Sequence, residues 1–177
     1  SVPVPDPVLA ALRGYDTPTV CNVIELLEIR PRTAGYTDAR IRACYPSLPP
    51  MVGFASTATF RAAAPPRGGD TYMGLSNQVA LLEKTPGLNV PVRVGGVWVH
   101  PGDLLHGDRN GITTIPVELA DLVAEGCAGF MDAEKVMLDY LRAGAVTSGG
   151  FGAARDEAKR RMGAIGERLR AAARGRS

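Results

Sequence analysis

The sequence predicts a single mixed α/β domain with a C-terminal helical extension, and three observations carry this prediction. Short apolar runs alternate with glycine-containing turns over residues 91–116, which is typical of antiparallel strands. Apolar residues recur at intervals of three and four over residues 17–27 and again after Pro116, which indicates helices. Residues 153–174 repeat that helical pattern with a strongly basic opposite side.

Composition limits the classes of protein that fit. A chain of 177 residues suits one domain, and its net charge of +2 is small. Residues 153–177 hold eight Lys or Arg against three Asp or Glu. Such a basic tail can make salt-sensitive contacts with nucleic acid, but it lacks interleaved aromatic residues. We therefore interpret it as a solvated helix face and predict no nucleic-acid partner.

Cysteine use and hydropathy point to a cytoplasmic protein. The three cysteines are widely spaced and form no C-x-x-C pair, so neither a disulfide framework nor a zinc site is predicted, and we expect small core residues: Cys21, Cys44 and Cys127. No apolar run reaches the ~20 residues of a membrane span. The first residues lack the basic and apolar regions of a secretory signal. We expect no membrane partner.

Two short helices are predicted near the start of the chain. Asp6 is expected to be the N-cap of the first helix, with Pro7 at its first position, and Gly14 to end it. Thr17-Pro18 repeats this start. The second helix then has one buried stripe, formed by Val20, Val23, Ile24 and Leu27.

The middle of the chain gives weaker signals. Residues 29–50 are predicted to be a connection with at most one edge strand, at residues 40–43. Residues 52–61 alternate in the manner of a strand. A further helix is expected from Asp70 or Thr71 to Leu82, after a loop.

Three turn signals between residues 91 and 116 predict a small antiparallel sheet. Gly95-Gly96 suits a tight hairpin between strands at 92–94 and 97–99. The segment 100–103, His-Pro-Gly-Asp, has the signature of a type II turn. The segment 108–111, Asp-Arg-Asn-Gly, reverses the chain once more before a last strand.

The remainder of the chain is predicted to be helical. Gly126 and Gly129 each weaken the helix after Pro116 by ~1 kcal/mol relative to Ala, so a kink or two helices is expected. Residues 143–152 have the composition of a linker. We divide the chain into a domain at 1–143 and a linker with an amphipathic basic helix at 144–177. That helix is expected to pack on its own body or on a neighbouring subunit.

Three motifs, in order, resemble the family that joins 4-hydroxy-4-methyl-2-oxoglutarate aldolases to RraA, the regulator of ribonuclease activity. They are YDTPTVCN at 15–22, MVGFASTAT at 51–59 and the glycine-punctuated segment at 91–116. The resemblance implies an α/β fold of the swivelling β/β/α type. It also implies a homotrimer or a multiple of one, with sites between subunits.

The same resemblance implies a divalent-metal-dependent lyase, a class II pyruvate aldolase, that cleaves a small-molecule 2-oxo acid. Aldol cleavage of the 4-hydroxy-4-methyl-2-oxoglutarate type and decarboxylation of the oxaloacetate type both fit. Mg²⁺ or Mn²⁺ would act as a Lewis acid on the enolate. The alternative is a non-catalytic RraA-like regulator that binds a ribonuclease.

One segment of the family pattern is missing. Relatives carry a βαβ unit with an Arg-Asp pair that holds the metal and the oxo acid, and no such unit lies near residues 87–88. Either the protein lacks the unit or the printed sequence omits it. We favour omission, because the loss of central strands would expose sheet edges. No catalytic residue or metal ligand can therefore be assigned.

Four supporting residues are candidates for substrate binding: Asn22, Thr19, Asp108 and Asn110. Asn22 occupies a position where relatives often have an acid, and a surface Asn bonded to nearby backbone is an equally good interpretation. Thr19 fits a helix start better than a site. For Asp108 and Asn110, turn chemistry is the stronger interpretation.

His100 and His106 lie six residues apart and invite comparison with a metal pair. No third ligand lies at a recognised spacing. We do not predict a metal role for them.

Overall fold

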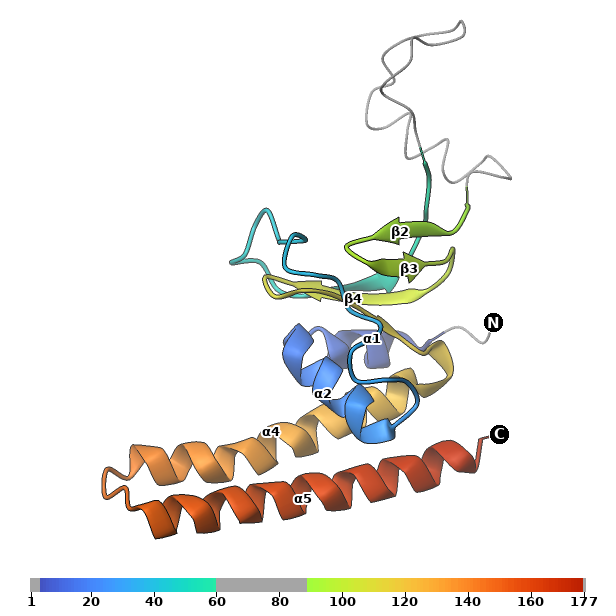
Figure 1. The fold of residues 1–177 in the computed structure, drawn as a ribbon. Coiled ribbons are helices and arrows are strands. Elements are labelled where there is room, and N and C mark those ends of the chain that lie inside the picture. Colours follow the sequence, from blue (N-terminus) through green and yellow to red (C-terminus); the bar gives the residue numbers. More distant parts are fainter. Residues whose placement is uncertain (1–3, 60–88, 177) are drawn as a thin grey trace, which may run out of the picture.

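The computed structural model describes residues 4–59 and 89–176. It has three layers, which Figure 1 shows from top to bottom: the strands, the short helices α1 and α2, and the long helices α4 and α5. The mixed α/β fold class is confirmed. None of the described helices combines the length and apolar character that crossing a bilayer requires.

Helices α1 (Asp6–Leu12) and α2 (Thr17–Leu27) form as predicted, but each is capped one residue earlier. Pro5 is the N-cap of α1 and makes no side-chain cap. Asp16 caps α2, because its side chain accepts a hydrogen bond from the Thr19 amide at 2.9 Å. The predicted stripe of α2 is buried throughout, with exposed fractions of 3% or less.

The strands form two antiparallel sheets rather than the one predicted. β1 (Met51–Phe54), β4 (Leu104–Asp108) and β5 (Gly111–Ile115) pair in the order β1-β4-β5. β2 (Val92–Val94) and β3 (Val97–Val99) form a separate hairpin. One face of the larger sheet packs on the helices, where Leu104 and Ile115 join Val20 and Val123 in the core.

The predicted turns are confirmed by backbone angles. Gly95, Gly96 and Gly102 have φ values of 55°, 86° and 84°, a region that glycine enters without strain. The predicted strand at 40–43 does not form. Instead, Tyr36 makes an isolated bridge with Thr113 beside β5. β1 is also shorter than predicted: it ends at Phe54, although the Ala55 backbone still bonds Asp103 and Gly102. Residues 60 and 61 of the predicted strand lie outside the described residues.

Helix α4 (Ala120–Arg142) is continuous, preceded by the short 3₁₀ helix η1 (Val117–Leu119), so the glycines do not divide it into two helices. Gly126 and Gly129 instead allow side chains of the neighbouring helices to approach α4 closely. A Cβ on Gly126 would lie 2.6 Å from Val23 Cγ1 on α2 and 2.8 Å from Leu169 Cδ1 on α5. The three helices therefore approach most closely where α4 has no side chain.

Helix α5 (Ser148–Arg174) begins five residues earlier than predicted, inside the proposed linker. Thr147 caps it by accepting from the Gly150 amide at 3.1 Å. α5 runs back along α4 and also contacts α2 (Figure 1). The expected packing of this helix on its own body is confirmed.

Two predictions lie outside the described residues. They are the helix expected from residue 70 to residue 82 and the junction at residues 87–88, where the family's βαβ unit is missing.

Candidate ligand pocket

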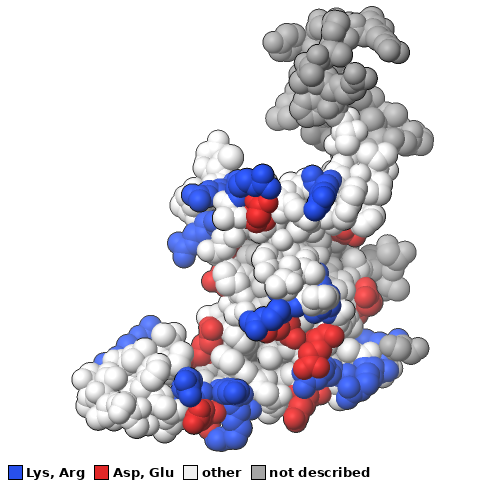
Figure 2. Space-filling model, in the orientation of Figure 1, with Lys and Arg blue, Asp and Glu red and all other residues white. Residues whose placement is uncertain are grey.

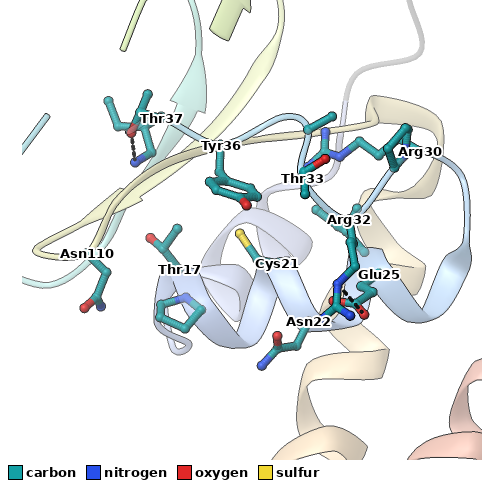
Figure 3. Close-up of a pocket in the computed structure, with 15 residues that line it drawn as sticks. Thr17, Cys21, Asn22, Glu25, Arg30, Arg32, Thr33, Tyr36, Thr37 and Asn110 are labelled. Atoms are coloured by element: carbon teal, nitrogen blue, oxygen red, sulfur yellow. Dashed lines mark hydrogen bonds and ion pairs between the residues drawn. The ribbon is translucent and has the colours of Figure 1, made fainter. Parts of the chain in front are cut away.

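The candidate site is a pocket of about 330 Å³ that three segments of the chain form together, two of them near residues 17–37 and the third near residue 110. Its walls are the first half of α2, the segment 30–37 and the turn between β4 and β5, which contribute Thr17, Cys21 and Asn22, then Arg30, Arg32, Thr33 and Tyr36, and finally Asn110. Figure 3 shows these side chains around the hollow. Helix and sheet therefore both position the site.

Arg30 gives the pocket a half-buried positive charge. Its Nη1 donates to the Thr114 hydroxyl at 2.7 Å and its Nη2 donates to the Thr113 hydroxyl at 3.2 Å. Burial lowers the pKa of Arg30 from its ordinary 12.5, and a guanidinium stays charged under such conditions. The two threonines fix the orientation of the guanidinium and leave further N–H donors for a ligand.

Gly35 explains how Arg30 can lie so close to the chain. A Cβ at this position would overlap the Arg30 guanidinium, and the φ of Gly35 is +85°. The Thr113 hydroxyl in turn donates to the Gly35 carbonyl at 2.9 Å. The segment 30–37 is thus folded around the arginine.

The other polar groups lie around Arg30. Asn22 on α2 and Asn110 on the β4–β5 turn both line the pocket. Arg32 reaches down to Glu25, with Nε 3.4 Å from Oε1, and this ion pair is exposed (Figure 3). Surface pairs of this kind contribute little to stability, so Arg32 can rearrange toward an anion.

Cys21 and Tyr36 form the less polar part of the pocket, with the tyrosine ring directed toward the cysteine in Figure 3. Burial raises the pKa of the Cys21 thiol, against smaller opposing effects from Thr113 and Arg30. The thiol is therefore neutral at pH 7. The expectation of three core cysteines is correct for Cys127 alone, because Cys21 is half-buried and Cys44 is exposed.

The remaining two predicted site residues do not line this pocket. Thr19 is 6% exposed, and its amide is used by the Asp16 cap. Asp108 lies beside the pocket, where its carboxylate accepts from the Thr17 amide at 2.9 Å and from the Asn110 amide at 2.7 Å. Of the four candidates, the structure brings Asn22 and Asn110 together.

Asp108 remains a carboxylate in these surroundings. Partial burial alone would raise its pKa, but hydrogen bonds from Thr17 and Asn110 outweigh burial and hold the pKa below its usual range. The N–H groups of Thr17 and Asn110 thus stabilise the negative charge of the Asp108 carboxylate.

His106 is a buried anchor of the fold. It has no exposed surface, and its Nε2 lies 3.1 Å from the Leu12 carbonyl and 3.0 Å from the Tyr15 carbonyl. Carbonyls only accept, so Nε2 carries the proton and Nδ1 accepts from the Thr17 hydroxyl at 3.0 Å. Burial lowers the pKa of this imidazole. His106 therefore joins β4 to the corner between α1 and α2 as a neutral side chain.

The pocket does not suit the divalent metal that the resemblance implies. Within residues 4–59 and 89–176, no three His, Cys, Asp or Glu side chains gather as a metal site would require. The pocket itself has two arginines and one carboxylate, Glu25, whereas Mg²⁺ prefers several oxygen ligands. We therefore assign no metal ligand in this part of the chain.

The basic character of the tail is largely balanced by acidic neighbours. Arg161 pairs with Glu157, Arg168 with Glu125 and Arg170 with Glu28. On the face drawn in Figure 2, positive and negative side chains are mixed along the helical layer. This arrangement is typical of a solvated helix surface.

Sequence reasoning missed Arg30, Arg32 and Tyr36 because residues 29–50 have no periodicity and were treated as a connection. One signal was present. Two arginines close to Gly35, in a loop that follows a capped helix, are expected more often at a binding site than in a plain connection.

Comparison with known proteins matches part of this chain to a protein family. The RraA-like family, described as Aldolase/RraA, matches residues 75–114. The predicted resemblance to this family is confirmed. The described part of the match, residues 89–114, covers strands β2, β3 and β4 and the turn that carries Asn110.

Structural comparison gives a fold-level likeness. The crystal structure of an uncharacterized protein from Pseudomonas syringae pv. tomato str. DC3000 superposes with a TM-score of 0.60 and 17% sequence identity. The match covers 87% of this chain and 95% of the other. At this identity the likeness shows the fold alone. No curated protein matches the sequence of this chain.

Proposed function

We propose that this RraA-like chain is a lyase that cleaves a small 2-oxo acid and that the pocket beside α2 receives a carboxylate of that acid. The observation that carries the proposal is the half-buried guanidinium of Arg30, oriented by the Thr113 and Thr114 hydroxyls. A rigid fork of N–H donors matches a carboxylate in geometry and charge. The match to an aldolase-containing family supports the reaction class.

The surrounding groups fit such a ligand in size and polarity. A volume of about 330 Å³ holds a small acid. The amides of Asn22 and Asn110 can donate to, or accept from, its keto and hydroxyl groups. Arg32 can leave Glu25 and approach a second negative group at little cost.

Dependence on Mg²⁺ or Mn²⁺ belongs to the lyase part of the proposal. The described residues supply no cluster of metal ligands, so the proposal assigns no residue of this part of the chain to a metal. The carboxylate contact requires only the side chains of the pocket.

Two measurements test the proposal. Pyruvate and oxaloacetate would be titrated into the ¹⁵N-labelled chain, and pyruvate release would be followed with a lactate dehydrogenase couple, with and without added Mg²⁺ or Mn²⁺. We expect Arg30→Gln to weaken binding by about 10–100-fold, because a charge-assisted hydrogen bond contributes about 1.5–3 kcal/mol. Arg93→Gln removes an exposed arginine on β2, away from the pocket, and is the matched control.

The second candidate is an RraA-like regulator that binds a ribonuclease without catalysis. The match to a family described as Aldolase/RraA supports this candidate as well. Absence of pyruvate release under every metal condition, together with no resonance shift at Cys21 or Asn22 on titration, would refute the lyase and its carboxylate site.

A further inference from the structure

We infer that Asp108 is a positioning residue of the pocket, because its single carboxylate joins the α2 wall to the wall formed by the β4–β5 turn. Oδ2 accepts from the Thr17 amide at 2.9 Å, and Oδ1 accepts from the Asn110 amide at 2.7 Å. Asn110 Nδ2 also donates to Oδ2 at 3.2 Å. The effect on ligand affinity rests on the proposed function, whereas the link between the walls does not.

The two groups that Asp108 holds lie in the pocket itself. Thr17 lines it at the start of α2, and Asn22 lies on the same helix just beyond the first turn. Asn110 lines it from the other wall. The Asp108 carboxylate therefore fixes the separation between two amide side chains, Asn22 and Asn110, that would contact a ligand.

The contact from Nδ2 also orients the Asn110 side chain. An amide has one donor end and one acceptor end. Because Nδ2 donates one of its two hydrogens to Asp108, the amide is held in one orientation, with Oδ1 and the second N–H available to a ligand. Asp108 thus sets the direction as well as the place of this group.

Neighbouring contacts make the link rigid. His106, two residues earlier on β4, binds the Thr17 hydroxyl at 3.0 Å. Thr17 is thereby held through both its amide and its hydroxyl. The third wall is tied separately, since Ile112 donates to the Thr37 hydroxyl at 3.0 Å. Loss of Asp108 should therefore loosen the Thr17 amide and the start of α2 from the turn, while the His106 contact remains and residues 30–37 are not released.

The experiment compares Asp108→Asn with Asp103→Asn in the full chain. Asp103 is the matched control, because its carboxylate also bonds a turn amide, that of His100 at 2.8 Å, but it does not line the pocket. We expect Asp108→Asn to raise the Kd for pyruvate about fivefold or more and Asp103→Asn to leave it within about twofold. Asp108→Asn should have a smaller effect in an Asn110→Ala background, because coupled residues are not additive.

Hydrogen exchange gives a readout that needs no ligand. The Thr17 and Asn110 amides should exchange faster in Asp108→Asn, and the Ile24 amide should not change. If Asp108→Asn does not fold, Asp108→Ser keeps one oxygen acceptor and takes its place.

The outcomes separate the two proposals. Unchanged exchange at Thr17 and Asn110 overturns the positioning role, whatever the ligand result. Pyruvate binding in the unaltered chain, with equal Kd values for the two Asp variants, overturns that role and leaves the proposed function standing. If neither pyruvate nor oxaloacetate binds, the proposed function fails, and faster exchange at both amides still supports the link between the walls.

Discussion

Replacement of Gly126 by alanine tests whether the close approach of α2, α4 and α5 holds the pocket-bearing helix in place. The added Cβ would lie 2.6 Å from Val23 Cγ1 and 2.8 Å from Leu169 Cδ1. Ordinary carbon contacts are about 3.5–4.0 Å, so each pair is too close by about 1 Å. Val23 is fully buried and Leu169 is 1% exposed, so neither can move into solvent.

The magnitude follows from two opposing effects. Overpacking of a core costs about 1–3 kcal/mol, whereas alanine in place of a helical glycine contributes about 1 kcal/mol of stability. We therefore expect Gly126→Ala to lower the free energy of unfolding by about 1 kcal/mol. Gly163→Ala should raise it by a similar amount, because a Cβ there meets no atom within 4 Å.

Thermal unfolding followed by circular dichroism at 222 nm measures the difference between the two variants. For a chain of this size, about 2 kcal/mol corresponds to midpoints about 4–8 °C apart. If Gly126→Ala is as stable as Gly163→Ala, the three helices do not meet in the way described. A destabilised Gly126→Ala should also bind pyruvate more weakly, since α2 carries Asn22.

Three further predictions concern the titration of His106, hydrogen exchange at the Thr147 amide and the alkylation of the cysteines. The pKa of His106 is lowered in the folded chain from its ordinary 6.5, so on acidification the imidazole takes up a proton in the unfolded chain before it does so in the folded chain. The urea midpoint should therefore fall on acidification below about pH 6.5, and His106→Gln should flatten that dependence. Tyr140 accepts from the Thr147 amide at 2.9 Å, so Tyr140→Phe should speed exchange of that amide, whereas Tyr45→Phe, at an exposed side chain, should not. Burial raises the pKa of Cys127 to about 12, so mass spectrometry after iodoacetamide treatment of the folded chain should find the exposed Cys44 alkylated and Cys127 unmodified. Equal urea midpoints at pH 5 and pH 7, unchanged exchange at Thr147, or early alkylation of Cys127 would contradict the respective prediction.

Local patterns predicted the parts of the fold that local forces determine. The α2 stripe follows from the spacing of Val20, Val23, Ile24 and Leu27, and all four are buried. The turns at Gly95-Gly96 and Gly102 follow from the need for positive φ. The α2 stripe and the glycine turns form as predicted, because both depend on residues only a few positions apart in the sequence.

Helix α4 shows where local reasoning fails. Gly126 and Gly129 suggested a break, because isolated glycines weaken a helix. The helix continues through them, and the missing side chains allow close contact with Val23, Leu169 and Ile165. The residues that pack against these two glycines lie on α2 and α5, so the sequence of α4 alone does not reveal the contacts.

The pocket extends the same argument to function. Asn22 and Asn110 could be chosen singly from their motifs, but their meeting depends on contacts between residues about 90 positions apart, such as Thr17 with Asp108. Arg30 reaches the pocket only because β5 places two threonine hydroxyls beside it. The pattern of turns predicts only that Asp108 ends a strand. In the folded chain its carboxylate also accepts a hydrogen bond from the Thr17 amide. It bonds the start of α2 and the turn, and in the proposed role it sets the separation between Asn22 and Asn110.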